Sequence, residues 1–257
     1  MYPLKKAYVL ILKKIEIGSA IAVRLTKYTG KSKVFVHPKH FLNAKPWFTN
    51  YLQKKDLVLD LGSGNGQNAI KSSNYSKKVI GVEMDKNLIE IAQQSVYEKG
   101  IKNIKFQAGN LEEKLEFKSN SFNKVIFLDV LEHLRKRDEI LKEVYRVLKP
   151  KGIIMVGVPN KTTSWKKMQR SVGISSFSDP DHKIEFSQND VNKLLKKFKF
   201  KIIHFGYAPY DTPFRGFYDI VGSLSLSTYK KIYKWRVEKV KKDTNEASGF
   251  EIAAQKS

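Results

Sequence analysis

The feature that most constrains this chain is an apolar strand that runs directly into a glycine-rich loop. Residues 58–66 read V-L-D-L-G-S-G-N-G, with glycines at three alternate positions. Glycine permits a turn with positive φ and lets a ligand approach the backbone closely. The N-terminus of a following helix offers N–H groups that have no partner within the helix. The pattern therefore predicts a strand–loop–helix unit that binds a small molecule at the loop.

Strand and helix patterns alternate along the rest of the chain. Seven short apolar runs predict strands at 57–61, 79–82, 104–107, 124–128, 153–158, 201–205 and 250–254. Three amphipathic stretches predict helices at 87–98, 137–148 and 188–197, the last of them capped by Ser187. Strands that alternate with helices are joined by crossover connections. We therefore expect an α/β fold built on a mostly parallel sheet.

The organisation expected from the sequence has four parts. Residues 1–50 form a basic helical extension, 51–207 the ligand-binding core, 208–249 an aromatic and basic lid insertion, and 250–257 the last strand and tail. The region 160–185 reads as a loop. In the extension, apolar residues recur near helical spacing between lysines, so its helix either packs on the core or lies on a membrane surface.

The acidic residues around the loop indicate the class of ligand. The dinucleotide fingerprint is G-x-G-x-x-G, whereas here the third glycine follows the second by two residues. Asp60 precedes the first glycine, and its carboxylate would repel a pyrophosphate but could reach an amino group. Glu83 ends the second strand, 21 residues after Gly62, a spacing that suits two ribose hydroxyls. These features favour a ligand with an amino-acid moiety and a ribose.

The next two strands also end in polar residues. Asn110 and Leu111 follow the third strand and offer a polar edge and an apolar face to a base. Asp129 ends the fourth strand. Ligands of open α/β sheets bind at the carboxyl ends of the strands, so these residues are expected at one site.

With these runs the chain resembles the class I S-adenosylmethionine-dependent methyltransferases. The matching runs are V-L-D-L-G-S-G-N-G, V-I-G-V-E-M-D, S-F-N-K-V-I-F-L-D-V-L-E-H-L and L-K-E-V-Y-R-V-L-K-P-K-G. The small-molecule group that includes the quinone-biosynthesis O-methyltransferases is the most similar, over about residues 45–206. The resemblance implies a Rossmann-like sheet of seven strands with the last antiparallel, and S-adenosylmethionine as cofactor.

The resemblance also assigns roles to residues. The methionine part of the cofactor would be held by Asp60, Gly62, Ser63, Gly64 and Gly66. Glu83 would bind the ribose, Met84, Asn110 and Leu111 the adenine, and Asp129 would complete the cofactor site. The family usually has Asp where Asn110 stands, and an amide can still accept a hydrogen bond from adenine.

The residues around Asp129 are the candidates for catalysis. Asp129, Glu132 and His133 would share one face if they began a helix. In the similar quinone O-methyltransferases an acid-x-x-Glu-His run supports a divalent metal that could activate a phenol. His182 is a second candidate base. A structural role for these residues is the alternative.

Charge and composition leave the acceptor open. The 257 residues include 48 Lys and Arg against 25 Asp and Glu, a net charge of +23, and no cysteine. The missing cysteine excludes a thiolate nucleophile such as cytosine C5 methylation requires. We expect O-methylation of a small or lipid-linked acceptor. The alternatives are RNA as the acceptor and a non-catalytic cofactor-binding scaffold at a membrane.

The basic surface suggests where the protein works. Lys230, Lys231, Lys234 and Arg236 form a basic run that we expect to face an anionic membrane or RNA. Lysines interrupt the apolar N-terminal stretch, which predicts neither a membrane span nor a secretory signal. A cytoplasmic protein, peripheral at the membrane, is the expectation.

Overall fold

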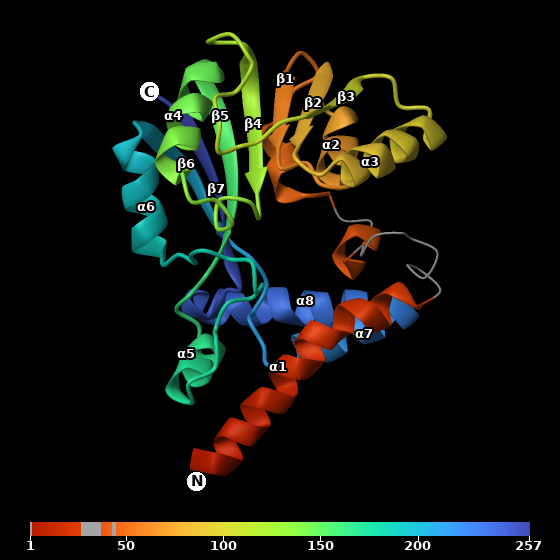
Figure 1. Ribbon diagram of the computed structural model, residues 1–257, viewed down its shortest axis with the longest axis vertical. Helices are drawn as coiled ribbons and strands as arrows, with labels where there is room; N and C mark the ends of the chain where they lie inside the picture. The colour runs from red at the N-terminus through yellow and green to blue at the C-terminus, as the bar shows by residue number, and fades with distance from the viewer. Residues whose placement is uncertain (1, 27–36, 43–44) are drawn as a thin grey trace. The chain divides into compact units, whose positions relative to one another are not determined.

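The computed structural model describes residues 2–26, 37–42 and 45–257 (Figure 1). The chain forms two compact units, each assembled from several segments. The sheet unit comprises residues 45–159, 179–206 and 250–257. The helical unit comprises residues 1–44, 160–178 and 207–249. Residues 160–178, which we expected within the core, thus group with the N-terminal segment and the insertion.

One seven-stranded sheet organises the sheet unit, in the order β3-β2-β1-β4-β5-β7-β6. The strands are β1 (Leu57–Leu61), β2 (Lys78–Glu83), β3 (Ile104–Ala108), β4 (Phe122–Leu128), β5 (Leu148–Pro159), β6 (Phe200–Tyr207) and β7 (Gly249–Lys256). The first five pair in parallel. The N–H of Ser257, after β7, bonds to the carbonyl of Lys199, before β6, so β7 runs antiparallel. The predicted sheet is confirmed.

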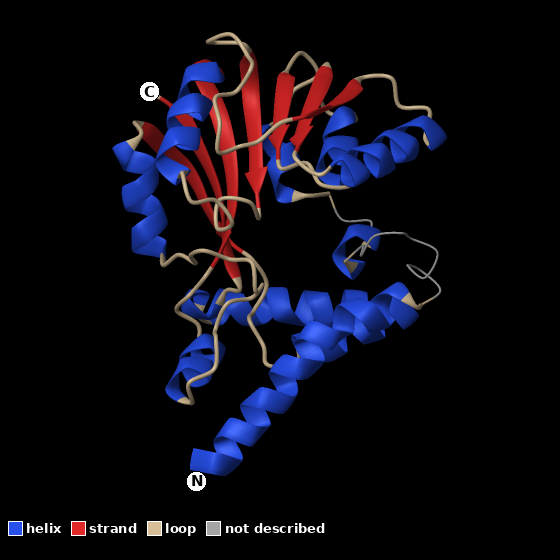
Figure 2. Ribbon diagram, viewed as in Figure 1, coloured by secondary structure: helices blue, strands red, loops and turns tan. Residues whose placement is uncertain are grey.

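Helices flank this sheet (Figure 2). They are α2 (Gln67–Ser73), α3 (Lys86–Glu98), α4 (Arg137–Val147) and α6 (Gln188–Lys197), with a 3-10 turn η2 at Trp47–Tyr51. The predicted cap is present, because the side chains of Ser187 and Asp190 bond reciprocally to each other's backbone N–H. Val58, Val79, Phe106 and Ile126 belong to the core that fixes α2 and α3 against the strands.

The helical unit contains α1 (Tyr2–Arg24), α5 (Ser164–Ser171), α7 (Arg215–Leu224) and α8 (Leu226–Lys242), with 3-10 turns η1 (Pro38–Phe41) and η3 (Thr244–Glu246). The region expected as a loop therefore holds α5. Its residues Trp165 and Val172 pack against Val9 and Leu12 of α1. That the insertion forms a lid over an acceptor stays a prediction.

Buried polar groups form contacts within and between the segments of the helical unit. Arg236 is 6% exposed, and its Nε donates to the carbonyl of Tyr210 at 2.9 Å. His37 Nε2 lies 3.2 Å from Asp219 Oδ1, and Thr163 donates to Asp211 at 2.6 Å. The expectation that Arg236 belongs to a solvent-facing basic surface is therefore wrong, since a buried guanidinium is retained here by its partners.

Two helix glycines give opposite predictions for stability. A Cβ at Gly216 of α7 would lie 2.7 Å from the Cα of Glu16, where α7 crosses α1, whereas a Cβ at Gly18 would meet nothing within 4 Å. Alanine favours an exposed helix by about 1 kcal/mol, but overpacking against backbone costs ~1–3 kcal/mol. Gly216→Ala should lower the free energy of unfolding, and Gly18→Ala should raise it. Chemical denaturation of both variants measures this, and equal stability of the two would contradict the helix crossing.

Candidate functional site

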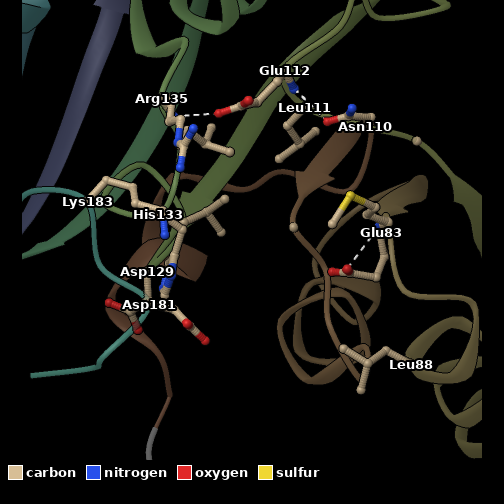
Figure 3. A pocket seen from close by; sticks show the side chains of 15 residues that line it. Glu83, Leu88, Asn110, Leu111, Glu112, Asp129, His133, Arg135, Asp181 and Lys183 are labelled. Atoms are coloured by element: carbon tan, nitrogen blue, oxygen red, sulfur yellow. Dashed lines mark hydrogen bonds between the residues drawn. The ribbon is translucent and has the colours of Figure 1, made fainter.

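The site lies where the order of the sheet reverses. β1 and β4 are neighbours at the centre, and the chain leaves them toward opposite edges, which opens a crevice beyond their carboxyl ends. A cavity of about 760 Å³ occupies this crevice. Its lining comes wholly from the sheet unit and includes Gly62 after β1, Glu83 at the end of β2, Asn110 after β3 and Asp129 after β4 (Figure 3).

The glycine loop closes the cavity on the β1 side. Gly62, Gly64 and Gly66 all have positive φ (67°, 51° and 81°). A Cβ at Gly62 would lie 2.5 Å from the side chain of Val130, so only glycine allows the loops after β1 and β4 to meet. A Cβ at Gly64 would meet nothing within 4 Å. The loop therefore presents open backbone at its centre.

Glu83 holds that loop in place. Its Oε2 accepts a hydrogen bond from the N–H of Gly64 at 2.9 Å, and its Oε1 accepts from Met84 and Asp85 at 2.8 and 3.1 Å. A carboxylate has about four acceptor sites, so Oε2 can accept from a further donor. Glu83 thus orders the loop and still offers an acceptor to a hydroxyl in the cavity.

The wall after β3 is tied to the loop that follows β4. Asn110 Oδ1 accepts from the N–H of Glu112 at 3.0 Å, and its Nδ2 donates to Glu113 at 2.8 Å. Glu112 in turn accepts from the backbone N–H of Arg135. That hydrogen bond keeps the pKa of Glu112 below its ordinary value. The fixed amide leaves a lone pair of Asn110 for an adenine amino group.

Asp60 lies buried behind the loop and does not line the cavity. Asp60 is 1% exposed. Burial raises the pKa of its carboxyl to about 8, and a hydrogen bond from the N–H of Ala69 partly opposes this rise. Within residues 2–26, 37–42 and 45–257, Asp60 Oδ2 and Ser63 Oγ find no hydrogen-bond partner. A cationic ligand group nearby would favour the ionised carboxylate.

Asp129 begins a turn, not a helix. Its φ is +57°, and the next helix starts only at Arg137. The left-handed conformation is tolerated by Asp but cannot continue into an α-helix. The expectation that Asp129, Glu132 and His133 share a helix face is therefore wrong. The strained conformation lets Asp129 line the cavity.

A cluster of two histidines and two glutamates lies beside that turn. Glu132, His133 and His182 each have one possible metal-ligand atom, a carboxylate oxygen or an imidazole nitrogen, and these three atoms lie within 4.8 Å of one another. His182 Nδ1 lies 3.1 Å from Glu185 Oε1, and its ring meets that of His133 edge-on at 4.7 Å. The group of side chains that could bind a metal ion thus contains His182 in place of Asp129.

His133 is the member of this cluster that reaches the cavity. Desolvation, followed by the proximity of His182, lowers the pKa of His133 below its ordinary value of 6.5, although Asp179, Asp181 and Asp129 oppose the shift. His133 is therefore neutral at pH 7 and can accept a proton. In Figure 3 it lies on the same side as Asp129, Asp181 and Lys183, facing Glu83 and Leu88.

The cavity brings together much of the predicted site. The predicted residues that line it are Gly62, Glu83, Met84, Asn110, Leu111, Asp129 and His133. Those that do not are Asp60, Ser63, Gly64, Gly66, Glu132 and His182. Sequence reasoning missed several lining residues, namely Leu88, Glu112, Val130, Leu134, Arg135, Asp181 and Lys183. The run L-E-H-L-R at 131–135 is apparent in the sequence, but nothing in it distinguishes a residue that lines the cavity, such as Arg135, from a charged residue on the surface.

Comparison with known proteins identifies the family. The profile of a family described as "Methyltransferase domain" matches residues 52–201, which is more than half of the chain. The chain belongs to this methyltransferase family. The strand order, the glycine loop and the acidic residue at the end of β2 are those of a class I S-adenosylmethionine-dependent methyltransferase.

Individual relatives are similar over part of their length. An uncharacterized methyltransferase, YcgJ, of Bacillus subtilis is 37% identical over 95 residues, covering 37% of each chain. A putative methyltransferase, YqeM, of the same species is 28% identical over 143 residues, which cover 54% of this chain and 56% of the relative. The chain thus spans less than two thirds of the length of these curated relatives. The crystal structure of YcgJ has the same fold, with a TM-score of 0.58 and 21% identity over 81% of this chain and 96% of that one.

The residues at this site fit S-adenosylmethionine. Asp60 and Ser63 provide buried oxygens near the glycine loop, where the ligand's ammonium group would lie. Glu83 retains an acceptor for the ribose, and Asn110, Leu111 and Met84 line the wall where adenine would bind. The open backbone at Gly64 leaves room for the methionine part.

The ribose assignment predicts a loss of cofactor affinity. Glu83→Ala should weaken S-adenosylhomocysteine binding by ~10–100-fold, since charge-assisted hydrogen bonds contribute ~1.5–3 kcal/mol. The exposed Glu90 on α3 provides the matched control, and Glu90→Ala should leave affinity unchanged. Because Glu83 also orders the loop, calorimetry should include 2′-deoxy-S-adenosylhomocysteine. The wild type should distinguish the two ligands and Glu83→Ala should not; retained discrimination would contradict the assignment.

The buried carboxyl of Asp60 predicts a pH dependence. Its pKa of about 8 in the folded chain, against an ordinary value of 3.8, means that the folded state holds a proton between pH 4 and 8 that the unfolded state has lost. The free energy of unfolding should therefore fall as pH rises, by up to about 1.4 kcal/mol per pH unit. Denaturation of the wild type and Asp60→Asn from pH 5 to 8 measures this. The asparagine variant should gain stability relative to the wild type toward pH 8, and a constant difference would contradict a raised pKa.

Proposed function

We propose that this protein transfers the methyl group of S-adenosylmethionine to an oxygen of a small-molecule or lipid-linked acceptor. The observation that carries the proposal is His133, which lines the cavity with a lowered pKa. A neutral imidazole at that position can accept the proton that a hydroxyl acceptor loses. The relatives support the choice of acceptor class, since they include a ubiquinone biosynthesis O-methyltransferase of Bartonella bacilliformis, 25% identical over 57% of this chain and 60% of that relative.

The bound cofactor supplies an electrophilic methyl group on sulfur. Transfer forms a bond between the acceptor oxygen and the methyl carbon, breaks the bond from that carbon to sulfur, and releases the hydroxyl proton. Glu83 and the glycine loop hold the cofactor at one side of the cavity, and His133 takes the proton at the other. Most of the catalysis then comes from alignment of the acceptor and from the general base.

His182 positions His133. The Glu185 carboxylate 3.1 Å from His182 Nδ1 favours the tautomer that protonates Nδ1, leaving Nε2 toward Glu132 at 3.9 Å. The ring of His182 meets that of His133 edge-on, so it restricts the orientation of the imidazole in the cavity. We assign His182 and Glu185 as positioning residues, and His133 as the catalytic base.

The same donor set fits a divalent ion. Imidazole nitrogens and a carboxylate are common metal ligands, and a carboxylate behind a ligating histidine is a usual supporting contact. Glu132, His133 and His182 would then hold the ion, so that His133 would be a metal ligand in place of the base, and Glu185 would orient His182. Such an ion would supply Lewis-acid activation of a phenol or catechol oxygen.

Turnover of methyl-labelled cofactor tests the proposed function. With a panel of catechols, phenols and a lipid extract as acceptors, the wild type should produce labelled methyl ethers. His133→Gln should lower kcat/KM by ~10²–10⁴-fold, and the control His204→Gln, at an exposed position of β6, should not. In the wild type kcat/KM should rise with pH and level off by about pH 7, because the pKa of His133 is lowered. Label found only in nitrogen or carbon products would contradict O-methylation.

Chelation separates the two roles of the histidine cluster. If a metal takes part, excess chelator should abolish turnover and Mg²⁺ or Mn²⁺ should restore it. Full activity in excess chelator would assign Glu132 and His182 to positioning alone. S-Adenosylhomocysteine binding, measured in parallel, should be insensitive to the chelator in either case.

A further inference from the structure

The first helix of the helical unit presents an apolar face with no partner in the described chain. Leu4, Ile11 and Ile21 of α1 are 78%, 57% and 68% exposed, and the other large exposed apolar residues of this segment are Tyr8, Leu10, Ile17 and Leu25. With 3.6 residues per turn, positions seven apart lie on one side of a helix. Leu4 and Ile11 follow that spacing, Leu25 comes directly after the end of α1, and Leu10 and Ile17 form the adjacent row.

The opposite side of α1 is packed within the unit. Val9, Leu12, Ser19 and Val23 are buried, at spacings of three, seven and four residues, which place them on one side of the helix. Val9 and Leu12 contact the α5 region, and the backbone at Glu16 meets Gly216 of α7. One side of α1 is therefore packed against the rest of the helical unit. The exposed apolar side belongs to a helix held in place and not to a chain terminus without contacts.

Charge indicates what this face contacts. The helical unit has 21 Lys and Arg against six Asp and Glu, so it carries +15 of the net charge of +23. On α1 itself, Lys14 lies within the apolar face, and the exposed Lys6 and Arg24 lie at one edge of it. An apolar helix face bordered by cations is the arrangement of helices that lie in the interface of an anionic membrane.

We propose that the exposed apolar face of α1 is a docking surface for an anionic lipid bilayer. The helix would lie along the surface, because none of the helices among residues 2–26, 37–42 and 45–257 has the length and apolar character needed to cross a membrane. Its 23 residues span about 34 Å at 1.5 Å per residue. The apolar side chains enter the acyl boundary, while the cations meet the phosphates. This proposal does not depend on the methyl acceptor.

A second helix of the same unit adds a smaller apolar surface. Phe214, Phe217 and Leu224, at the start, within and at the end of α7, are 41%, 43% and 55% exposed. Trp235 of α8 is 44% exposed, near the exposed Lys231 and Lys234. Aromatic rings and lysines of this kind are suited to the headgroup region. We nevertheless place the test on α1, because its face is the larger and the more apolar.

Sedimentation of the full chain with vesicles tests the proposal. The probes are vesicles of phosphatidylcholine alone and of phosphatidylcholine with 30% phosphatidylglycerol, each at low and high salt. The wild type should bind the anionic vesicles at least tenfold more tightly than the neutral ones, and high salt should weaken this binding. Ile11→Gln/Ile21→Gln should lower binding at least tenfold, and Lys6→Gln/Lys14→Gln about fivefold per lysine.

The matched control exchanges exposed apolar residues elsewhere. Tyr97→Gln/Ile203→Gln, at exposed positions of the sheet unit, should bind vesicles like the wild type. All variants should bind S-adenosylhomocysteine with unchanged affinity, which shows that they fold. Equal loss in the control variant, or wild-type binding that ignores phosphatidylglycerol, would overturn the proposal. So would binding to RNA without binding to vesicles. A wild type that does not bind vesicles and self-associates in solution, with the α1 variant monomeric, would also overturn it, because the face would then bind a second copy of the chain.

Discussion

The carboxylate of Glu83, at the end of β2, accepts hydrogen bonds from the backbone N–H groups of Gly64, Met84 and Asp85, beside the point between β1 and β4 where the sheet reverses its order. That interaction fixes the glycine loop against the end of β2. The loop in turn meets Val130 after β4, and this contact sets the distance between the two halves of the crevice. The carbonyl of Val82 also accepts from the N–H groups of Gly62 and Ser63, at 2.9 and 3.0 Å, so the end of β2 satisfies most of the donors of the glycine loop and keeps its shape.

The other side of the cavity depends on the backbone conformation of Asp129. The left-handed backbone at Asp129 ends β4 abruptly and starts a turn that carries His133 to the cavity and leaves Glu132 buried beside His182. A regular helix from Asp129 would have given these residues one common face. The turn instead places His133 in the cavity lining and keeps Glu132 buried beside His182. This arrangement would orient the proposed general base without exposing its partners to solvent.

The helical unit is assembled from three separate segments of the chain. These segments are far apart in the sequence, and polar contacts between them, His37 with Asp219 and Thr163 with Asp211, hold them together beside a small apolar core. The basic composition of these segments therefore has two uses. Some cations are structural and buried, and the others remain on the surface with the apolar face of α1.

The sequence by itself determined the sheet, the ligand loop and the family, because these depend on local patterns: apolar runs of strand length, glycines at positive φ and acidic residues at strand ends. The strand-end residues Glu83, Asn110 and Asp129 were predictable since parallel strands place their carboxyl ends together. Tertiary structure alone decided that Asp60 is buried, that His182 replaces Asp129 beside Glu132 and His133, that Arg236 is structural, and that residues 160–178 pack with α1. Each of these depends on contacts between residues distant in sequence. The local pattern of apolar and polar residues does not show which residues such contacts will bury.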